Sequence, residues 1–324
     1  MQATAKAHTN IALIKYWGKR NEALKLPMNN SLSLTLDALY TTTTVDFQTG
    51  LEKDIFYLNE KEIHGTSYRR VSDFLQLIRQ LSGKKDHAVV RSINTVPTAA
   101  GFASSASGFA ALAAASVRAL DLSMNDMELS RLTRQGSGSA CRSIYGGIVE
   151  WQQGEKSDGS DSFAVQLEKE TYWDIRVAAV VLVDEEKSVS SSDGMQRTVN
   201  TSAFYRGWID SIPADLKAIK EGICERDFEK VGSIAEANCL RMHGTTLGAY
   251  PPFTYWSHRT FAVMETIQQM RKKGIPVFFT IDAGPNVKVL YLPEHEDILK
   301  ETLYATPGVK KLVLSRLGQG VTYS

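Results

Sequence analysis

The chain has few cysteines, and they are poorly placed for a shared role. Only three of its 324 residues are cysteine, Cys141, Cys224 and Cys239, and they are far apart without the spacing of a metal site. An odd, scattered set argues against a disulfide framework and favours a reducing compartment. We therefore expect a cytoplasmic protein.

An excess of charge of one sign is also lacking. The 37 Lys and Arg residues nearly cancel the 36 Asp and Glu residues. Such a chain has no overall field to attract nucleic acid or an anionic membrane surface. We expect neither as a partner, so an anionic ligand must be held by a local site.

Long hydrophobic runs are missing as well. The most apolar stretch, residues 109–117, is far shorter than the roughly 20 residues that a transmembrane helix needs. The first residues do not follow the pattern of a signal peptide. With 43% hydrophobic and 23% charged residues, the composition is that of a soluble globular protein, and the length favours two domains.

Strand and helix patterns alternate along the sequence. Two-residue alternation or short apolar runs indicate strands, and apolar residues three and four apart indicate helices. The predicted strands are 31–36, 41–47, 87–92, 175–183, 277–281 and 287–292; the predicted helices are 68–81, 108–120, 123–134 with Ser123 as the N-cap, 203–209, 216–223, 228–242 and 260–273. We expect a sheet with helices on one side in the first half, and a boundary that divides the chain into residues 1–185 and 186–324.

Residues 97–107, PTAAGFASSAS, resemble a phosphate-binding loop. Small residues let the backbone approach an anion, serine hydroxyls add donors, and the helix that follows directs unpaired N–H groups to the same place. Neither the Walker pattern nor the dinucleotide-binding pattern is present. A small-residue helix packed closely on a neighbour would give the same sequence, so both interpretations stay open.

Three further segments carry charged groups in unusual surroundings. Lys15 and Lys19 flank two aromatic residues in an apolar stretch, which favours an anionic partner, although the lysines could also extend to solvent past core aromatics. Residues 135–143 offer small residues and Arg142 to an anion, or form a flexible connector. Asp282 follows a strand and precedes a Gly-Pro turn, as a general base or as a turn residue.

The sequence around His243 indicates a structural role for this titratable residue. His243 is followed by Gly244, and this pair is typical of the last turn of a helix. We interpret His243 as the end of the helix 228–242 rather than as a catalytic base.

Five motifs in order resemble those of the diphosphomevalonate decarboxylase family, within the GHMP kinase superfamily. They are NIALIKYWGK at 10–19, NNSLS at 29–33, PTAAGFASSA at 97–106, GSGSACRS at 136–143 and DAGPNVK at 282–288. A single motif of this kind would be weak, but five in order are specific. The resemblance covers most of the chain.

The resemblance implies an α+β fold of two domains, the GHMP-type fold. The N-terminal domain would resemble the second domain of ribosomal protein S5, and the C-terminal domain would be ferredoxin-like. The implied activity is the ATP-dependent decarboxylation of mevalonate 5-diphosphate to isopentenyl diphosphate, with Mg²⁺, and we expect a homodimer.

The resemblance also assigns roles to residues. Asp282 would hold or accept the proton of the substrate's 3-hydroxyl, Lys19 would lie beside this carboxylate, and Arg142 would bind the substrate's anionic groups. Substrate contacts are further implied for Tyr16, Ser137, Gly138, Ser139 and Ser191. ATP contacts are implied for Lys15, Ser92, Asn94, Pro97, Ala100, Gly101, Ala103, Ser104, Ser105 and Ser107, with magnesium held at Ser104 and Ser105 through the ATP phosphates.

One departure from the family pattern bears on the substrate. Several bacterial members have an arginine where this chain has Ser192, which is followed here by the acidic Asp193. A decarboxylase of the monophosphate, or a mevalonate kinase, therefore stays an alternative, as does a nucleotide-binding regulator without catalysis. The presence of Lys19, Arg142 and Asp282 together favours the complete decarboxylation.

Overall fold

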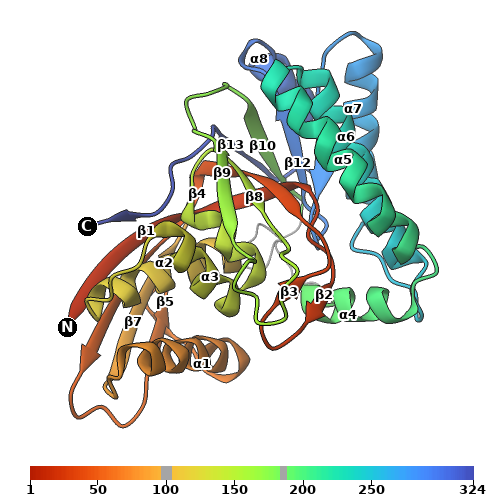
Figure 1. Cartoon of the computed structure of the whole chain (residues 1–324). Helices are drawn as coiled ribbons and strands as arrows, with labels where there is room; N and C mark the ends of the chain where they lie inside the picture. Colours follow the sequence, from red (N-terminus) through yellow and green to blue (C-terminus); the bar gives the residue numbers. More distant parts are fainter. Residues whose placement is uncertain (96–103, 183–187) are drawn as a thin grey trace.

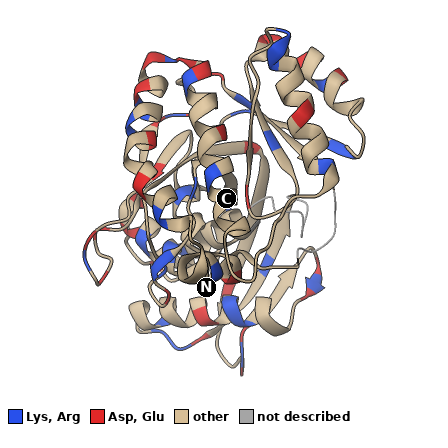
Figure 2. Ribbon diagram, turned by 90° about the vertical axis from the view of Figure 1, so that its right-hand side faces the viewer, with Lys and Arg blue, Asp and Glu red and all other residues tan. Residues whose placement is uncertain are grey.

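The protein is built from two sheets, each with its own helices. A computed structural model describes residues 1–95, 104–182 and 188–324. Figure 1 shows α1, α2 and α3 beside the first sheet, and α5, α6, α7 and α8 beside the second. In the ribbon of Figure 2, Lys and Arg residues (blue) and Asp and Glu residues (red) are interspersed along the chain. No helix in the described ranges is long and apolar enough to cross a membrane.

The first sheet is organised around two long antiparallel strands, β1 and β4. They pair from Gln2↔Asp46 to Ile14↔Leu32, with two shifts of register along β1. The strand order is β14-β1-β4-β7-β5-β6, and β8 joins β4 to β9. The strands are β1 (Gln2–Ile14), β4 (Ser31–Gln48), β5 (Ile55–Leu58), β6 (Lys61–Glu62), β7 (His87–Asn94), β8 (Ile148–Trp151), β9 (Ala164–Glu168) and β14 (Thr322–Tyr323), with a small separate hairpin of β2 (Lys19–Asn21) and β3 (Leu26–Pro27).

The alanine-rich helix α2 lies against the centre of this sheet. The helices of the first part are α1 (Gly65–Ser82), α2 (Ser104–Ala119), α3 (Asp126–Gly136) and the 3-10 helix η1 (Gly138–Ile144). Five alanines of α2, between residues 110 and 115, are fully buried, and α2 packs on β1 and β4. Close packing of small residues therefore explains the body of this helix, and only its N-terminus is available for an anion.

The second sheet has the order β11-β12-β10-β13 and is antiparallel throughout. Its strands are β10 (Arg176–Val181), β11 (Phe278–Ile281), β12 (Val287–Tyr291) and β13 (Lys311–Ser315). The helices are α4 (Ser191–Thr201), α5 (Tyr205–Glu225), α6 (Phe228–Leu247), α7 (His258–Lys272) and α8 (Glu296–Tyr304), with the short 3-10 helix η2 (Pro293–His295). Strand β11 lies at an edge of the sheet.

Two segments cross the division expected between residues 185 and 186. Strand β10 precedes it and belongs to the second sheet, whereas β14, at the end of the chain, returns to pair with β1. One hydrophobic cluster, which includes Trp17, Leu34, Val177 and Trp208, contains residues of both parts. The two sheets are thus joined by a continuous core, and the division by residue number stays a prediction.

Several local expectations are corrected by the structure. The N-cap of α3 is Asn125 rather than Ser123, because the Asn125 side chain accepts from the Glu128 N–H while Glu128 accepts from the Asn125 N–H. The two helices expected at 203–209 and 216–223 form one helix, α5, which has Pro213 in its interior.

The helix that was expected to end at residue 242 continues to Leu247. His243 is therefore an interior residue of α6 and does not terminate the helix. Residues 135–143 are the end of α3 followed by η1, and Cys141 and Arg142 are buried there. This segment is part of the folded core rather than a flexible connector.

Candidate active site

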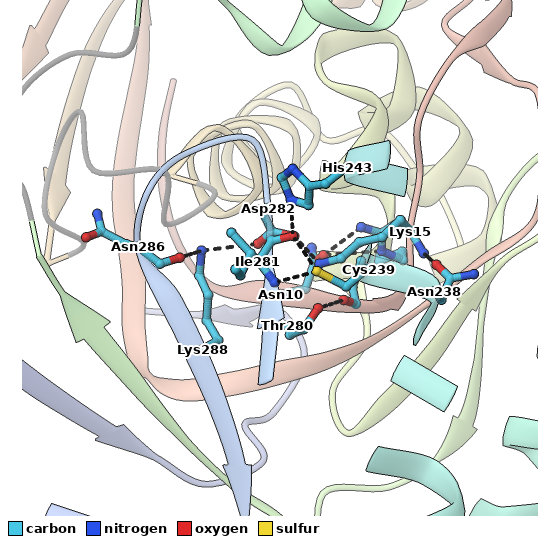
Figure 3. Close-up of polar contacts among 12 residues, drawn as sticks. Asn10, Lys15, Asn238, Cys239, His243, Thr280, Ile281, Asp282, Asn286 and Lys288 are labelled. Atoms are coloured by element: carbon cyan, nitrogen blue, oxygen red, sulfur yellow. Dashed lines mark hydrogen bonds and ion pairs between the residues drawn. The ribbon is translucent and has the colours of Figure 1, made fainter. Parts of the chain in front are cut away.

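Asp282 lies where the edge strand β11 ends, at the junction of the two sheets. Ile281 is the last residue of β11, and the Gly284 N–H donates to the Asp282 carbonyl at 2.7 Å, which closes a tight turn. The Thr280 hydroxyl donates to the carbonyl of Ala12, on β1, at 3.3 Å. The end of β11 is thereby held beside the end of β1 (Figure 3). The Asp282 side chain remains 22% exposed.

Two buried lysines flank the Asp282 carboxylate. Lys15 Nζ is 2.7 Å from Oδ1, and Lys288 Nζ is 3.4 Å from Oδ2, with 2% and 1% of the lysine side chains exposed. Burial alone would raise the pKa of Asp282, but Lys15 and Lys288 together outweigh it and hold the pKa below its usual value. Asp282 is therefore ionised at neutral pH. Burial, opposed by Asp282, lowers the pKa of Lys288.

The lysine beside Asp282 is Lys15, not the expected Lys19. The Lys15 backbone is held by two amide side chains, since its N–H donates to Asn238 Oδ1 at 2.9 Å and its carbonyl accepts from Asn29 Nδ2 at 2.8 Å. Lys19 instead pairs with Glu22 at 2.6 Å. The contact predicted between Lys19 and Asp282 is thus made by Lys15, which the family resemblance had assigned to ATP.

Arg142 is also buried, but its partners are uncharged. Its Nε and Nη2 donate to Asn10 Oδ1 at 3.2 and 2.9 Å, and its Nη1 donates to Ser31 Oγ at 2.5 Å. Burial lowers the pKa of Arg142, while Cys141 and Asp282 act in the opposite direction. The guanidinium is therefore within the electrostatic reach of Asp282, yet among the described residues it has no ion pair with a carboxylate.

The small-residue loop before Arg142 is fitted against Tyr16. A Cβ atom on Gly138 would lie 2.9 Å from the Tyr16 hydroxyl oxygen, so only glycine fits. The Tyr16 ring packs on Trp151 with centroids 4.7 Å apart. Burial raises the pKa of Tyr16, and its hydroxyl has no hydrogen-bond partner among the described residues. Ser137 is buried and Ser139 half-buried beside it.

The expected nucleotide side of the site is described only in part. Pro97, Ala100, Gly101 and Ala103 lie outside the described residues, and so does the side chain of Ser104. Helix α2 begins at Ser104, and Ser105 is half-buried. Further along, the Ser107 hydroxyl bonds that of Thr41 at 2.8 Å, which gives Ser107 a structural partner. Ser92 bonds Thr43 and Asn94 accepts from Thr41, both from β7. Nucleotide contacts of these residues stay predictions.

The N-terminus of α2 is suited to binding the phosphates of ATP together with magnesium. The first turn of this 16-residue helix carries no acidic residue that would oppose an anion, and its unpaired N–H groups favour negative charge. The described residues contain no group of three or more His, Cys, Asp or Glu that could hold a metal. The prediction that magnesium is held at Ser104 and Ser105 through the ATP phosphates stays a prediction.

Ser191 is the first residue of α4, next to the predicted departure from the family pattern. Its neighbour Ser190 is the N-cap, and Ser190 Oγ donates to Asp193 Oδ2 at 2.7 Å and accepts from the Asp193 N–H at 3.1 Å. The Tyr255 hydroxyl donates to the Ser190 carbonyl at 3.2 Å. The charge of Asp193 is thus directed to the helix N-terminus, while Ser192 is exposed.

Sequence reasoning missed three residues that shape the site. Lys288 pairs in register with Thr280, the second residue before Asp282, and the two-residue alternation of a strand could have placed it on the face of Asp282. Asn10 lies in the motif at 10–19 and Asn238 in the predicted helix 228–242, and neither was given a role. Their contacts join segments 223 and 132 residues apart, a distance over which no local pattern gives a signal.

Two family models match the chain. The diphosphomevalonate decarboxylase-like N-terminal domain matches residues 7–164, and the mevalonate 5-diphosphate decarboxylase C-terminal domain matches residues 177–314. Together they cover most of the sequence. The resemblance that the five motifs suggested is confirmed.

Curated relatives and solved structures agree. The diphosphomevalonate decarboxylase of Schizosaccharomyces pombe is 39% identical, with 94% of this chain and 82% of the relative covered. The human enzyme of the same name is 38% identical, with 90% and 77% covered. A structure of the mevalonate diphosphate decarboxylase from Staphylococcus aureus is 44% identical with a TM-score of 0.95, covering 100% of this chain and 98% of that one.

A further solved structure carries ligands. It is described as MDDEF in complex with MVAPP, AMPPCP and magnesium, is 49% identical and has a TM-score of 0.95, with 100% of this chain and 99% of that chain covered. The expected two-domain α+β architecture is confirmed by these likenesses, whereas the labels of its two domains stay predictions. The chain belongs to the diphosphomevalonate decarboxylase family.

Proposed function

We propose that the protein converts mevalonate 5-diphosphate and ATP to isopentenyl diphosphate, carbon dioxide, ADP and phosphate. The observation that carries this proposal is the ionised, partly exposed carboxylate of Asp282 between Lys15 and Lys288, with the guanidinium of Arg142 nearby. The similar MDDEF structure contains MVAPP, AMPPCP and magnesium together, which supports the pairing of these two substrates.

Asp282 acts on the 3-hydroxyl of the substrate. Its low pKa makes it a weak base toward a free alcohol, but an ionised carboxylate accepts a hydrogen bond and directs the hydroxyl oxygen. As the bond from this oxygen to the γ-phosphorus of ATP forms, the bond from that phosphorus to the bridging oxygen breaks and ADP leaves with its electron pair. The hydroxyl becomes acidic as this occurs, and its proton passes to Asp282. Such positioned proton transfer contributes about 10²- to 10⁴-fold to a rate.

The cations hold the negative charge of the substrate. Asp282, Lys15 and Lys288 together carry one net positive charge, and Arg142 adds a second. A guanidinium can bind a carboxylate or a phosphate through two parallel hydrogen bonds, and we assign Arg142 to the substrate's anionic groups. The other proposed substrate contacts are made by Tyr16, Lys19, Ser137, Gly138, Ser139 and Ser191.

Loss of the new phosphate drives the remaining chemistry. The bond between C3 and oxygen breaks with its electron pair going to phosphate, and positive charge develops at C3. The electron pair of the bond to the carboxylate then forms the carbon–carbon double bond as carbon dioxide leaves. The protein contributes placement, which can supply roughly 7–11 kcal/mol of a barrier.

ATP is proposed to bind at the N-terminus of α2. Ser105, Ser104 and the preceding loop would hold its phosphates, with Ser92 and Asn94 on the nucleoside side. Bound magnesium would neutralise charge on the phosphates during transfer. This assignment is supported by the small-residue sequence of the loop and by the 16-residue helix that follows it.

We propose a homodimer in the cytoplasm. The exposed apolar side chains of Phe204, Leu247 and Tyr250, with Phe204 placed against Gly248, offer surface that a second copy can cover. The scattered cysteines fit a reducing compartment. Light scattering of the purified protein measures the oligomeric state directly.

Product analysis tests the proposed reaction. The protein is incubated with ATP, Mg²⁺ and mevalonate 5-diphosphate, and ADP, carbon dioxide and isopentenyl diphosphate are quantified, with Asp282→Asn as the matched control. We expect the three products in equal amounts. ADP without carbon dioxide would indicate a kinase, faster turnover of the monophosphate would indicate the other decarboxylase, and no ADP would contradict catalysis.

A further inference from the structure

Helix α6 contacts the backbone of Lys15 and the backbone of Ile281, the residue next to Asp282. Asn238 accepts from the Lys15 N–H, and its Nδ2 donates to Asp215 Oδ2 at 2.8 Å. On the other side, His243 and Cys239 contact the backbone of Ile281, the residue directly before Asp282. One rigid element therefore reaches the two chain segments that carry the two charges (Figure 3).

The contacts between α6 and β11 follow the spacing of the helix. Glu236, Cys239 and His243 are three and four residues apart and so lie on one face. Glu236 Oε2 accepts from the Phe279 N–H at 3.0 Å, and Cys239 Sγ accepts from the Ile281 N–H at 3.1 Å. His243 Nε2 lies 3.1 Å from the Ile281 carbonyl oxygen. These side chains form hydrogen bonds with backbone groups of β11 that a neighbouring strand would otherwise satisfy.

The protonation state and tautomer of the His243 ring are determined by the groups around it. The side chain is 1% exposed and lies against Trp256, with ring centroids 4.8 Å apart. Burial lowers its pKa to about 3, so the ring is neutral. Because its Nε2 partner is a carbonyl, Nε2 carries the proton and donates. Nδ1 is buried without a hydrogen-bond partner among the described residues.

An unpartnered ring nitrogen in the core is unfavourable for folding. An apolar residue of similar size would avoid this cost, but it would leave the buried Ile281 carbonyl with only the weak Cys239 S–H as a donor. What only the histidine supplies is an N–H directed at the last carbonyl before Asp282. We propose that His243 and Asn238 are positioning residues, which set the distance between the Asp282 carboxylate and the Lys15 ammonium; this rests on the proposed function for its catalytic consequence.

Three variants separate positioning from packing. His243→Met removes the donor with little change of volume, His243→Gln keeps an N–H at a similar reach, and Met242→Leu alters the neighbouring buried residue, which belongs to the hydrophobic cluster. Misplacement of a reacting group by about 1 Å can cost about 100-fold in rate. We expect His243→Met to lower kcat by roughly 10- to 100-fold with little change in KM, and His243→Gln and Met242→Leu to stay near wild type.

Equal losses of kcat in His243→Met and His243→Gln, or no loss in either, would overturn the proposal. Asn238→Leu is the second test, because it removes the acceptor of the Lys15 N–H without changing β11. It should also lower kcat while thermal unfolding still occurs in a single transition. Wild-type kcat in this variant would refute the role of Asn238.

Crystal structures of the same variants give a readout that does not depend on the substrate. The distance from Lys15 Nζ to Asp282 Oδ1 should lengthen in His243→Met and stay near 2.7 Å in His243→Gln. If this distance responds but the wild type does not decarboxylate mevalonate 5-diphosphate, positioning stands and the proposed function fails. If the distance is the same in all variants, the positioning role is wrong whatever the reaction.

Discussion

Two buried groups of charge lie near each other in the site, and they are balanced differently. Asp282 is matched by Lys15 and Lys288, so each charge there has an opposite partner. Among the described residues, the Arg142 guanidinium donates to the neutral Asn10 and Ser31 and forms no ion pair. A buried charge without a counter-charge is unfavourable. The comparison indicates that the Asp282 group is held by its own ion pairs and has one positive charge left for a ligand, whereas the charge of Arg142 is balanced only by an anionic ligand.

The largest effect is expected from breaking the balanced group. Asp282→Asn keeps the shape but removes the negative charge, so turnover should fall by about 10²- to 10⁴-fold. Two buried ammonium groups then lack their counter-charge, which should also cost roughly 3–5 kcal/mol of stability. Carbon dioxide release and urea unfolding measure the two effects. An unchanged turnover would make Asp282 a turn residue.

At Arg142, in contrast to Asp282, we expect substitutions to weaken substrate binding without lowering the stability of the fold. Arg142→Lys replaces the two-pronged donor by a point charge, and substrate binding should weaken by about 2–5 kcal/mol. Arg142→Met removes a buried cation without a counter-charge, so its free energy of unfolding should equal or exceed that of the wild type. Substrate titration and urea unfolding test this pair. A large loss of stability in Arg142→Met would contradict the comparison.

The pH dependence of stability sharpens the comparison further. The folded-state pKa of Asp282 is below its ordinary value, so its ion pairs stabilise the protein above the unfolded-state pKa of about 3.9. As the pH falls from there through the folded-state pKa, this contribution is lost. The stability difference between the wild type and Asp282→Asn should therefore shrink below about pH 4. A difference that grows toward acid would have the wrong sign.

A smaller effect is expected at the exposed Ser192. Ser192→Arg adds a cation near the N-terminus of α4, where Asp193 is already engaged with Ser190. An exposed pair of this kind contributes about 0.2–1 kcal/mol, and the diphosphate should gain more than the monophosphate. Specificity constants for both substrates measure it. Equal gains would mean that the substrate's terminal phosphate does not lie near α4.

The sequence predicts the family and the position of Asp282, because both depend on local motifs. It does not tell which of two lysines four residues apart meets that carboxylate. The choice is made by Asn238, 223 residues away, and by Asn29, 14 residues away, which together hold the Lys15 backbone. The Asn238 contact follows from the packing of the two parts of the chain, which no local period encodes.

The same limit explains the misplaced helix end at His243. A histidine followed by glycine is typical of a last turn, but α6 continues to Leu247, with Thr245 and Thr246 buried and the Thr246 carbonyl accepting from the Phe253 N–H. In contrast, the helix at 68–81 was predicted well, because it has one buried face and a regular period. The strands predicted at 31–36 and 41–47 are parts of the single long strand β4, whose first six residues are all buried.

The side chains that cover the outer edge of β11 also bear on aggregation. An apolar edge strand such as Phe278–Ile281 is a template for pairing with another chain. Here the outward groups of alternate residues are occupied, since the Val277 carbonyl accepts from Arg271 and the backbones of Phe279 and Ile281 are bonded by α6. The helix that borders the active site therefore also keeps this strand from joining the sheets of neighbouring molecules in a crowded solution.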